Sequence, residues 1–252
     1  MIIISPSKNL NLSNEVFNFE KTSPSFLDQS LFLSKQIKKL STKEIKSLMK
    51  ISENLAKLNF ERFQGINSKS NIKKPAGFIF SGDTFHGLSI RSFSNLKLDY
   101  IQKNLRILSG LYGMLRPFDI IEPYRLEMGT KIDSILGISL YEFWREKLTK
   151  RLKDEIKQNN SEFLFNLASQ EYSSVLNLNA LECKVISFDF KKLKNGKLSG
   201  IGMMIKKLRG EMAKYILLNN INSLEKLKKF NFKGFVFSKF DKSSNNFLFI
   251  TQ

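Results

Sequence analysis

Arginine is scarce in this chain and is concentrated in one part of it. The 252 residues include 33 Lys but only 8 Arg, and five of the eight fall within 46 residues. A planar guanidinium grips a carboxylate or phosphate through two parallel hydrogen bonds, which a Lys ammonium cannot do. Arg in a Lys-rich chain therefore indicates a need for that geometry. The five are Arg106, Arg116, Arg125, Arg145 and Arg151.

Residues 106–131 combine these arginines with glycine, proline and acid. The stretch holds three Gly, two of the five Pro, three Arg and three carboxylates, and four basic minus three acidic residues gives +1. Gly permits close approach by a ligand, and backbone N–H groups in such turns can cradle a phosphate. We interpret the stretch as a shaped, nearly neutral functional centre. A rigid loop held by internal salt bridges would have the same composition.

A second candidate lies on a predicted helix over residues 204–219. Ile205, Arg209, Met212 and Ile216 are spaced 4, 3 and 4 apart and therefore share one helix face. Arg209 stands where an apolar residue is expected. A buried charge needs a partner, which could be a protein carboxylate or a bound anion. Alternatively, the stem packs while the head reaches solvent.

Two short polar loops follow predicted strands. They are residues 5–8, Ser-Pro-Ser-Lys, and residues 81–87, which contain Asp83 between Gly82 and Gly87. Ligands of α/β sheets bind beyond the strand ends, so we expect the two loops to meet at one edge of a sheet. Lys8 and Asp83 are the residues that offer chemistry there.

The positive charge is also unevenly spread. The net charge is +18, and residues 184–233 hold 13 Lys or Arg against 3 Asp or Glu, so +10 lies in one fifth of the chain. This region is the best candidate for contact with a phosphate backbone. The excess of Lys, with many Phe, Asn and Ile, is also what an AT-rich genome produces without selection for binding.

Several kinds of chemistry are excluded. His86 is the single His and Cys183 the single Cys, so neither a two-His metal site nor a zinc cluster nor an intrachain disulfide can form. A phosphate loop of the Gly-x4-Gly-Lys-Ser/Thr type is absent. With no 18-residue apolar run and no leader-like start, we expect a cytoplasmic protein without a membrane span. No cofactor or metal is indicated.

The surrounding pattern predicts a mixed α/β fold. Strands are expected at 1–4, 77–80 and 163–168, and hairpins at 185–203, around Asn195-Gly196, and at 234–250. Helices are expected at 25–40, 42–59, 98–108, 139–158 and 204–219, with a capping box at Ser41 and a cap at Gly110. The predicted fold is a single compact α/β domain over residues 1–252, with a mixed sheet, antiparallel C-terminal hairpins and surrounding helices.

A series of segments, in order along the whole chain, points to one known family. They are Ile4-Ser5-Pro6-Ser7-Lys8, Gly82-Asp83, Leu108-Ser109-Gly110-Leu111-Tyr112-Gly113, Leu115-Arg116-Pro117, Pro123-Tyr124-Arg125-Leu126-Glu127-Met128-Gly129, Leu140-Tyr141 with Phe143-Trp144, Asn166-Leu167-Ala168-Ser169, Glu171-Tyr172, and Lys206-Lys207 with Arg209-Gly210. With these segments the chain resembles the YaaA family of bacterial peroxide stress proteins. The chain departs from the family at Thr84-Phe85, Met204 and Lys214, where the family carries Val-Tyr, an aromatic residue and Arg.

The resemblance implies a function and a set of site residues. It implies a protein that binds duplex DNA without sequence preference, through a positively charged cleft and a helix-hairpin-helix-like element, and that limits reactive intracellular iron. It implies no established enzymatic reaction. The expected DNA or anion contacts are Lys8, Arg106, Ser109, Gly110, Tyr112, Gly113, Arg116, Arg125, Lys206, Lys207 and Arg209, with pocket carboxylates Asp83 and Glu127.

Two alternatives remain open from the residues. The near balance of charge in residues 106–131 also suits an enzyme or binding protein for a phosphorylated or carboxylated metabolite. In it, Arg116 and Arg125 would grip the anion, with Asp83 or Glu127 as the acid–base group. The third possibility, an iron site made of carboxylates, is disfavoured by the lack of His and Cys ligands.

Overall fold

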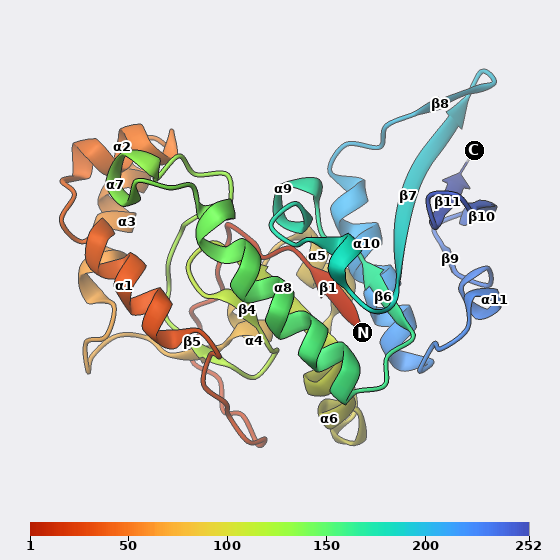
Figure 1. Ribbon diagram of the computed structural model, residues 1–252, viewed down its shortest axis with the longest axis horizontal. Helices are drawn as coiled ribbons and strands as arrows, with labels where there is room; N and C mark the ends of the chain where they lie inside the picture. The colour runs from red at the N-terminus through yellow and green to blue at the C-terminus, as the bar shows by residue number, and fades with distance from the viewer. Residues whose placement is uncertain (252) are drawn as a thin grey trace.

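A mixed β-sheet runs through the molecule (Figure 1). The computed structural model describes residues 1–251, and within them nine strands form this sheet, in the order β4-β3-β1-β6-β7-β11-β10-β9 with β8 paired to β7. Its strands are β1 (Ile2–Ile4), β3 (Leu105–Ser109), β4 (Gly113–Leu115), β6 (Phe163–Asn166), β7 (Lys184–Lys194), β8 (Lys197–Ser199), β9 (Asn231–Phe232), β10 (Phe235–Asp241) and β11 (Asn246–Thr251). A separate small sheet pairs β2 (Lys74–Pro75) with β5 (Ile120–Ile121).

The centre of the sheet is parallel and its flanks are antiparallel. β1 is parallel to both β3 and β6, β6 is parallel to β7, and β7 is parallel to β11. β4, β8, β10 and β9 are antiparallel to their neighbours. Parallel strands need both faces covered, and the uninterrupted apolar run of β1 fits that position because Ile2, Ile3 and Ile4 are at most 1% exposed.

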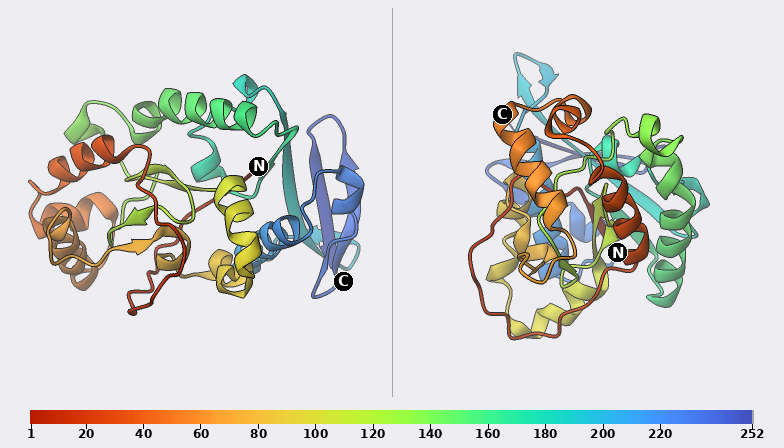
Figure 2. Two further views of the ribbon diagram at one scale, coloured as in Figure 1. Left: turned by 90° about the horizontal axis from the view of Figure 1, so that it is seen from below. Right: turned by 90° about the vertical axis from the view of Figure 1, so that its left-hand side faces the viewer.

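Helices cover both faces of the sheet, and a group of them lies at one end. α8 (Leu140–Gln158) lies over one face and α6 (Asn95–Asn104) with α10 (Met204–Leu218) over the other (Figure 2). α1 (Leu27–Ile37), α2 (Thr42–Met49), α3 (Glu53–Gly65) and α7 (Asp133–Leu136) gather at the end away from β11 (Figure 1). The remaining helices are the short α4 (Ala76–Ile79), α5 (Asp83–Leu88), α9 (Gln170–Ser173) and α11 (Leu224–Leu227).

Two glycines let α5 and α10 touch through their backbones. A Cβ atom at Gly210 would collide with the carbonyl oxygen of Thr84, and one at Gly87 would collide with the carbonyl oxygen of Lys207. Both glycines are buried. The contact therefore fixes the position of α10 relative to α5 with no side chain between them.

The fold class and most of the predicted elements are confirmed. Ser41 forms the expected capping box with Glu44. The β7–β8 hairpin turns at Asn195 and Gly196, whose φ angles of 50° and 71° are those of a type I′ turn. The closing hairpin is β10–β11.

Three predictions of secondary structure were wrong. The helix expected over 42–59 is two helices, because Lys50 adopts a left-handed conformation with φ 49° and Ser52 caps a new helix. The strand expected at 77–80 is mostly the short helix α4. The helix expected over 98–108 ends at Asn104, and the chain continues as β3. Ile107 and Leu108 are buried in that strand, so their apolar pattern is also that of a strand covered on both faces.

We expect Gly210→Ala to destabilise the protein by about 1–3 kcal/mol, because the added methyl must push α5 and α10 apart. Gly200→Ala is the matched control, since nothing lies within 4 Å of a Cβ at that position, and its free energy of unfolding should stay within about 0.5 kcal/mol of the parent. Denaturant unfolding of both variants checks this. Equal stability of the two variants would contradict the backbone contact.

Candidate functional site

A pocket opens where β1 and β6 end. Its volume is about 460 Å³, and it is lined by the residues that follow β1, by those that follow β6, and by α5 and α10. From β1 the chain reaches β3 on one side, whereas β6 lies on the other side of β1 and leads to β7. The connections thus diverge between β1 and β6, which is the topological switch point at which open α/β sheets bind ligands.

Serine hydroxyls join the loops around this pocket. The Ser169 backbone N–H donates to Ser5 Oγ at 2.8 Å, linking the loops that follow β6 and β1. Ser7 Oγ donates to the carbonyl oxygen of Ser81 at 2.8 Å, linking the loop after β1 to residues 81–87. The expectation that residues 5–8 and 81–87 meet at one edge of the sheet is therefore confirmed.

The pocket brings together six of the residues singled out from the sequence. Asp83 enters from the first turn of α5, and Lys206 and Arg209 enter from α10. The contact of Gly210 with Thr84 places Arg209 and Asp83 one residue away from that contact on each helix. The six residues in the lining are Lys8, Asp83, Arg125, Glu127, Lys206 and Arg209.

Three of these residues form one ion network, in which two cations share a single carboxylate. Glu127 accepts from Lys8 Nζ at 2.8 Å through Oε2 and from Arg125 Nη2 at 2.9 Å through Oε1. Burial would raise the pKa of Glu127, but the hydrogen bonds and charges of Lys8 and Arg125 together hold that pKa below its usual value. This part of the pocket is a closed ion network.

Arg209 lacks such a partner. It is half-buried, and within residues 1–251 no carboxylate lies within 4 Å of its guanidinium and no hydrogen bond engages it. Burial lowers the pKa of Arg209, and the more distant charge of Asp189 offsets only part of the effect. Among the described residues, the half-buried Arg209 thus has no protein carboxylate as its partner, and its guanidinium is open to an anion from solvent.

Sequence reasoning missed several residues of this region. His86, Ser169, Glu171 and Tyr172 also line the pocket. Arg62 of α3 lies near enough to Arg125 for their like charges to interact, and burial together with that charge lowers the pKa of Arg62. The Glu171-Tyr172 pair could have been identified from the sequence, because it belongs to the segments that resemble the family. Arg62 carried none, because it lies alone in an ordinary amphipathic helix.

A larger hollow adjoins the pocket. It has a volume of about 1150 Å³ and lies between α1, α2 and residues 129–135. Lys8, Arg125, Glu127 and Glu171 line both hollows. Lys39, Lys50 and Lys131 extend the lining, together with Glu44. The two adjoining hollows, which we call the groove, reach from α2 to α10.

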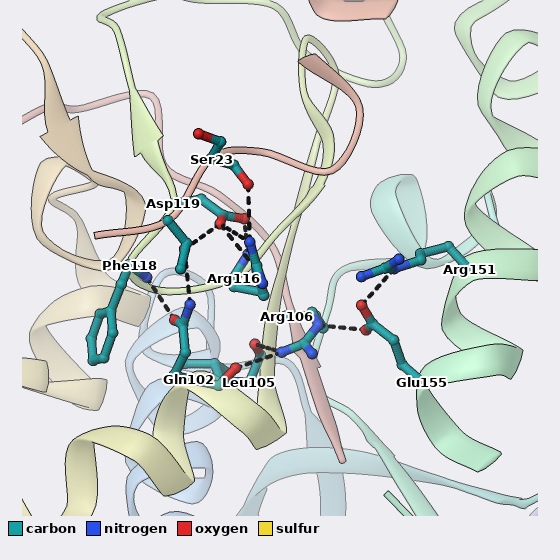
Figure 3. Close-up of polar contacts among 10 residues, drawn as sticks. Ser23, Gln102, Leu105, Arg106, Arg116, Phe118, Asp119, Arg151 and Glu155 are labelled. Atoms are coloured by element: carbon teal, nitrogen blue, oxygen red, sulfur yellow. Dashed lines mark hydrogen bonds and ion pairs between the residues drawn. The ribbon is translucent and has the colours of Figure 1, made fainter. Parts of the chain in front are cut away.

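Arg106 and Arg116 lie elsewhere, inside their own ion pairs (Figure 3). Arg106 is 4% exposed; its Nε donates to Glu155 at 2.6 Å and its Nη1 to the carbonyl oxygens of Gln102 and Leu105. Arg116 donates to Asp119 and to the carbonyl oxygen of Ser23. Neither lines the pocket, and both fit the alternative of a segment held by internal salt bridges.

The glycine-rich segment between them is a buried β-hairpin. Residues 105–115 are buried throughout, and β3 turns into β4 at 110–112. The hydroxyl of Ser109 hydrogen-bonds the Tyr124 hydroxyl at 2.6 Å and accepts from the Tyr112 N–H, while a Cβ at Gly110 would collide with the Leu126 carbonyl oxygen. Gly113 has φ 70° against Trp144. The expected helix cap at Gly110 and a helix-hairpin-helix-like arrangement at these residues were wrong.

Lys207 also lies outside the pocket lining. Its ammonium is 5.9 Å from the ring centroid of Phe232, a distance typical of a cation–π contact. Among residues 1–251, no group of three or more His, Cys, Asp or Glu side chains is placed to hold a metal ion. In the same part of the chain, no helix is both long and apolar enough to cross a membrane.

Comparison with known proteins gives the family. The family model described as "Peroxide stress protein YaaA" matches residues 1–240. The chain belongs to the YaaA family of peroxide stress proteins. It is 40% identical over 253 residues to a UPF0246 protein of Legionella pneumophila, covering 99% of this chain and 98% of that protein. It is 41% identical over 250 residues to a UPF0246 protein of Flavobacterium johnsoniae, covering 98% of each.

The family match spans every segment that builds the pocket. The matched range extends from β1 into β10 and so includes the loops after β1 and β6, α5 and α10. At one departure from the family pattern, Phe85 takes the place of a tyrosine. Its ring is 6% exposed and packs on Phe80 at a centroid distance of 5.3 Å, so this position contributes to the core.

We expect Arg106→Met to destabilise the protein and Arg209→Met not to destabilise it. Arg106→Met should lower the free energy of unfolding by about 3 kcal/mol, because it breaks a buried ion pair with Glu155. Arg209→Met should leave it unchanged or raise it, because Met keeps the apolar contacts of the stem and removes a cation that burial disfavours. Denaturant unfolding measures both. A large loss for Arg209→Met would show that Arg209 has a structural role.

Proposed function

We propose that this protein acts in the peroxide stress response by binding duplex DNA without reading its sequence, and that it limits the reactive iron that would damage this DNA. The observation that carries the proposal is the uncommitted positive charge of α10. The side chains of Arg209 and Lys206 line the pocket without a hydrogen bond or ion pair to any of residues 1–251. Such cations at a groove are suited to phosphate oxygens.

The elements next to α10 add to this charge. β8 ends five residues before α10 begins, and the β7–β8 hairpin projects beyond the rest of the sheet (Figure 1). Lys192, Lys194 and Lys197 are exposed on it. Contacts of this kind fix the position of a duplex through its phosphates and carry no base information, which supports binding without sequence preference.

The same charges supply a physical route to iron limitation. DNA holds a condensed atmosphere of cations, and a protein that neutralises phosphates with Lys and Arg releases them. Ferrous ion on the phosphates is one such cation. We propose that the groove displaces ferrous ion from the DNA it covers, so that peroxide meets less iron at the backbone.

Binding to a short blunt duplex should weaken steeply with salt. Each phosphate contact contributes about 0.9 to the slope of log K against log salt, so Lys206→Met and Arg209→Met should each reduce the slope by about that amount. Lys103→Met is the control, because the exposed Lys103 lies two residues before β3, at the amino end of the parallel strands, whereas the pocket lies at their carboxyl ends. Fluorescence anisotropy across a salt series gives the slopes. Binding that is insensitive to salt, or unchanged slopes in both variants, would refute the proposal.

Protection of DNA should follow the same residues. We expect the wild-type chain and Lys103→Met to reduce nicking of a supercoiled plasmid by ferrous ion and hydrogen peroxide. The double variant Lys206→Met/Arg209→Met should protect much less at equal concentration, because it displaces fewer cations. Gel analysis of the plasmid measures this. Equal protection by the double variant would show that iron limitation does not depend on these two cations of the groove.

A further inference from the structure

The pocket between the ends of β1 and β6 has the properties of a site for one small molecule, apart from any duplex. Its volume of about 460 Å³ lies within the range of about 300–1,000 Å³ typical of small-molecule sites. A duplex lying on the groove can contact the exposed Lys206 and the half-buried Arg209 from outside, but its body cannot enter a hollow of this volume. The side chains that line the pocket are therefore better matched to a single molecule about the size of a sugar.

Three charged side chains in the pocket are left uncommitted. Throughout the described part of the chain, residues 1–251, no hydrogen bond or ion pair engages the side chain of Asp83, Lys206 or Arg209. The other charges of the lining are used, since Glu127 binds Lys8 and Arg125 and Glu171 accepts from the Gly129 N–H. The free groups thus comprise two cations and one carboxylate.

These three groups are held on a rigid frame. Asp83 and Arg209 are each one residue away from the backbone contact of Thr84 with Gly210, and a Cβ at that contact would not fit. Asp83 and Arg209 line one pocket without pairing, because no bridge within 4 Å joins them. A ligand that fits between them must offer an anion to one side and a hydrogen-bond donor to the other.

We propose that this pocket binds a phosphomonoester of a sugar, with Arg209 and Lys206 on the phosphate and Asp83 accepting a hydrogen bond from a sugar hydroxyl. A phosphomonoester carries a charge of about −1.5 to −2, which two cations match, and the fork of Arg209 can engage two of its oxygens. A carboxylate on a ribose hydroxyl is the arrangement found at other switch-point sites. Inorganic phosphate has no sugar hydroxyl with which to reach Asp83 while Arg209 and Lys206 hold its oxygens.

The same chemistry has two sources, a free sugar phosphate and the 5′-phosphorylated end of a DNA strand. The test uses the full chain with ribose 5-phosphate, ribose and inorganic phosphate as probes. Thermal shift and isothermal titration calorimetry measure their binding. We expect ribose 5-phosphate to bind and to raise the melting temperature, inorganic phosphate to bind more weakly, and ribose to have no effect.

The variants assign the roles. Arg209→Met should weaken ribose 5-phosphate binding by at least about tenfold, the scale of a lost charge-assisted hydrogen bond. Asp83→Ala should lower the ratio of the affinity for ribose 5-phosphate to that for inorganic phosphate. Lys214→Met is the matched control, because it removes a Lys from the same helix but outside the pocket lining, and it should bind like the wild type.

Two duplexes that differ only in a 5′-phosphate or a 5′-hydroxyl distinguish the sources. Preference for the phosphorylated duplex, relieved by ribose 5-phosphate, identifies a DNA end; no preference identifies the free ester. The proposal is overturned if ribose 5-phosphate fails to bind at millimolar concentration, or if it binds equally well to Arg209→Met. Failure here with salt-dependent DNA binding intact leaves the DNA proposal standing, and binding of the ester without DNA binding overturns the DNA proposal alone.

Discussion

The structure depends on the burial of one short strand. β1 has neighbours on both edges and helices over both faces, so its three isoleucines contribute about 1.5–3 kcal/mol each through burial. Because β1 is enclosed on both edges and both faces, polar side chains can gather next to it only at its two ends. The carboxyl end leads into residues 5–9, and those residues form the floor of the pocket. Burial of β1 thus decides where polar side chains can gather.

The charges of the protein divide into two groups with different roles. Within the described part of the chain, five arginines are tied to carboxylates. Arg91 and Arg106 pair with the distant Glu15 and Glu155, whereas Arg116, Arg125 and Arg151 pair with a carboxylate two to four residues further along the chain. Arg209 and Lys206 lack such ties to the residues that the structure describes. The use of Arg in a Lys-rich chain therefore has two explanations here, because the planar fork suits both internal pairing and anion binding.

Much of the fold could be predicted from the sequence, and the reasons for the failures are physical. Capping residues and the Asn-Gly turn act locally, so Ser41 and Asn195 were interpretable without tertiary contacts. The helix expected over 98–108 was too long because Leu105 and Leu108 continue the helical spacing of Leu98 and Ile101, although both lie in β3. The pocket was half predictable. Arg209 stood out because it interrupts an apolar stripe, whereas the burial of Arg106 followed from Glu155, 49 residues further along the chain, which no local pattern reveals.

The pairing of β1 also has a consequence for how the chain folds. Ile2 pairs with Leu105 on one side and with Phe165 on the other, so the central strand gains its neighbours only after two long loops have closed. Contacts between residues so distant in sequence carry a large loop-closure entropy and slow the folding of a domain. The pocket draws on residues from Ser5 to Arg209, so it forms only when nearly the whole chain has assembled. A fragment that ends before α10 would lack the groups that we assign to the anion.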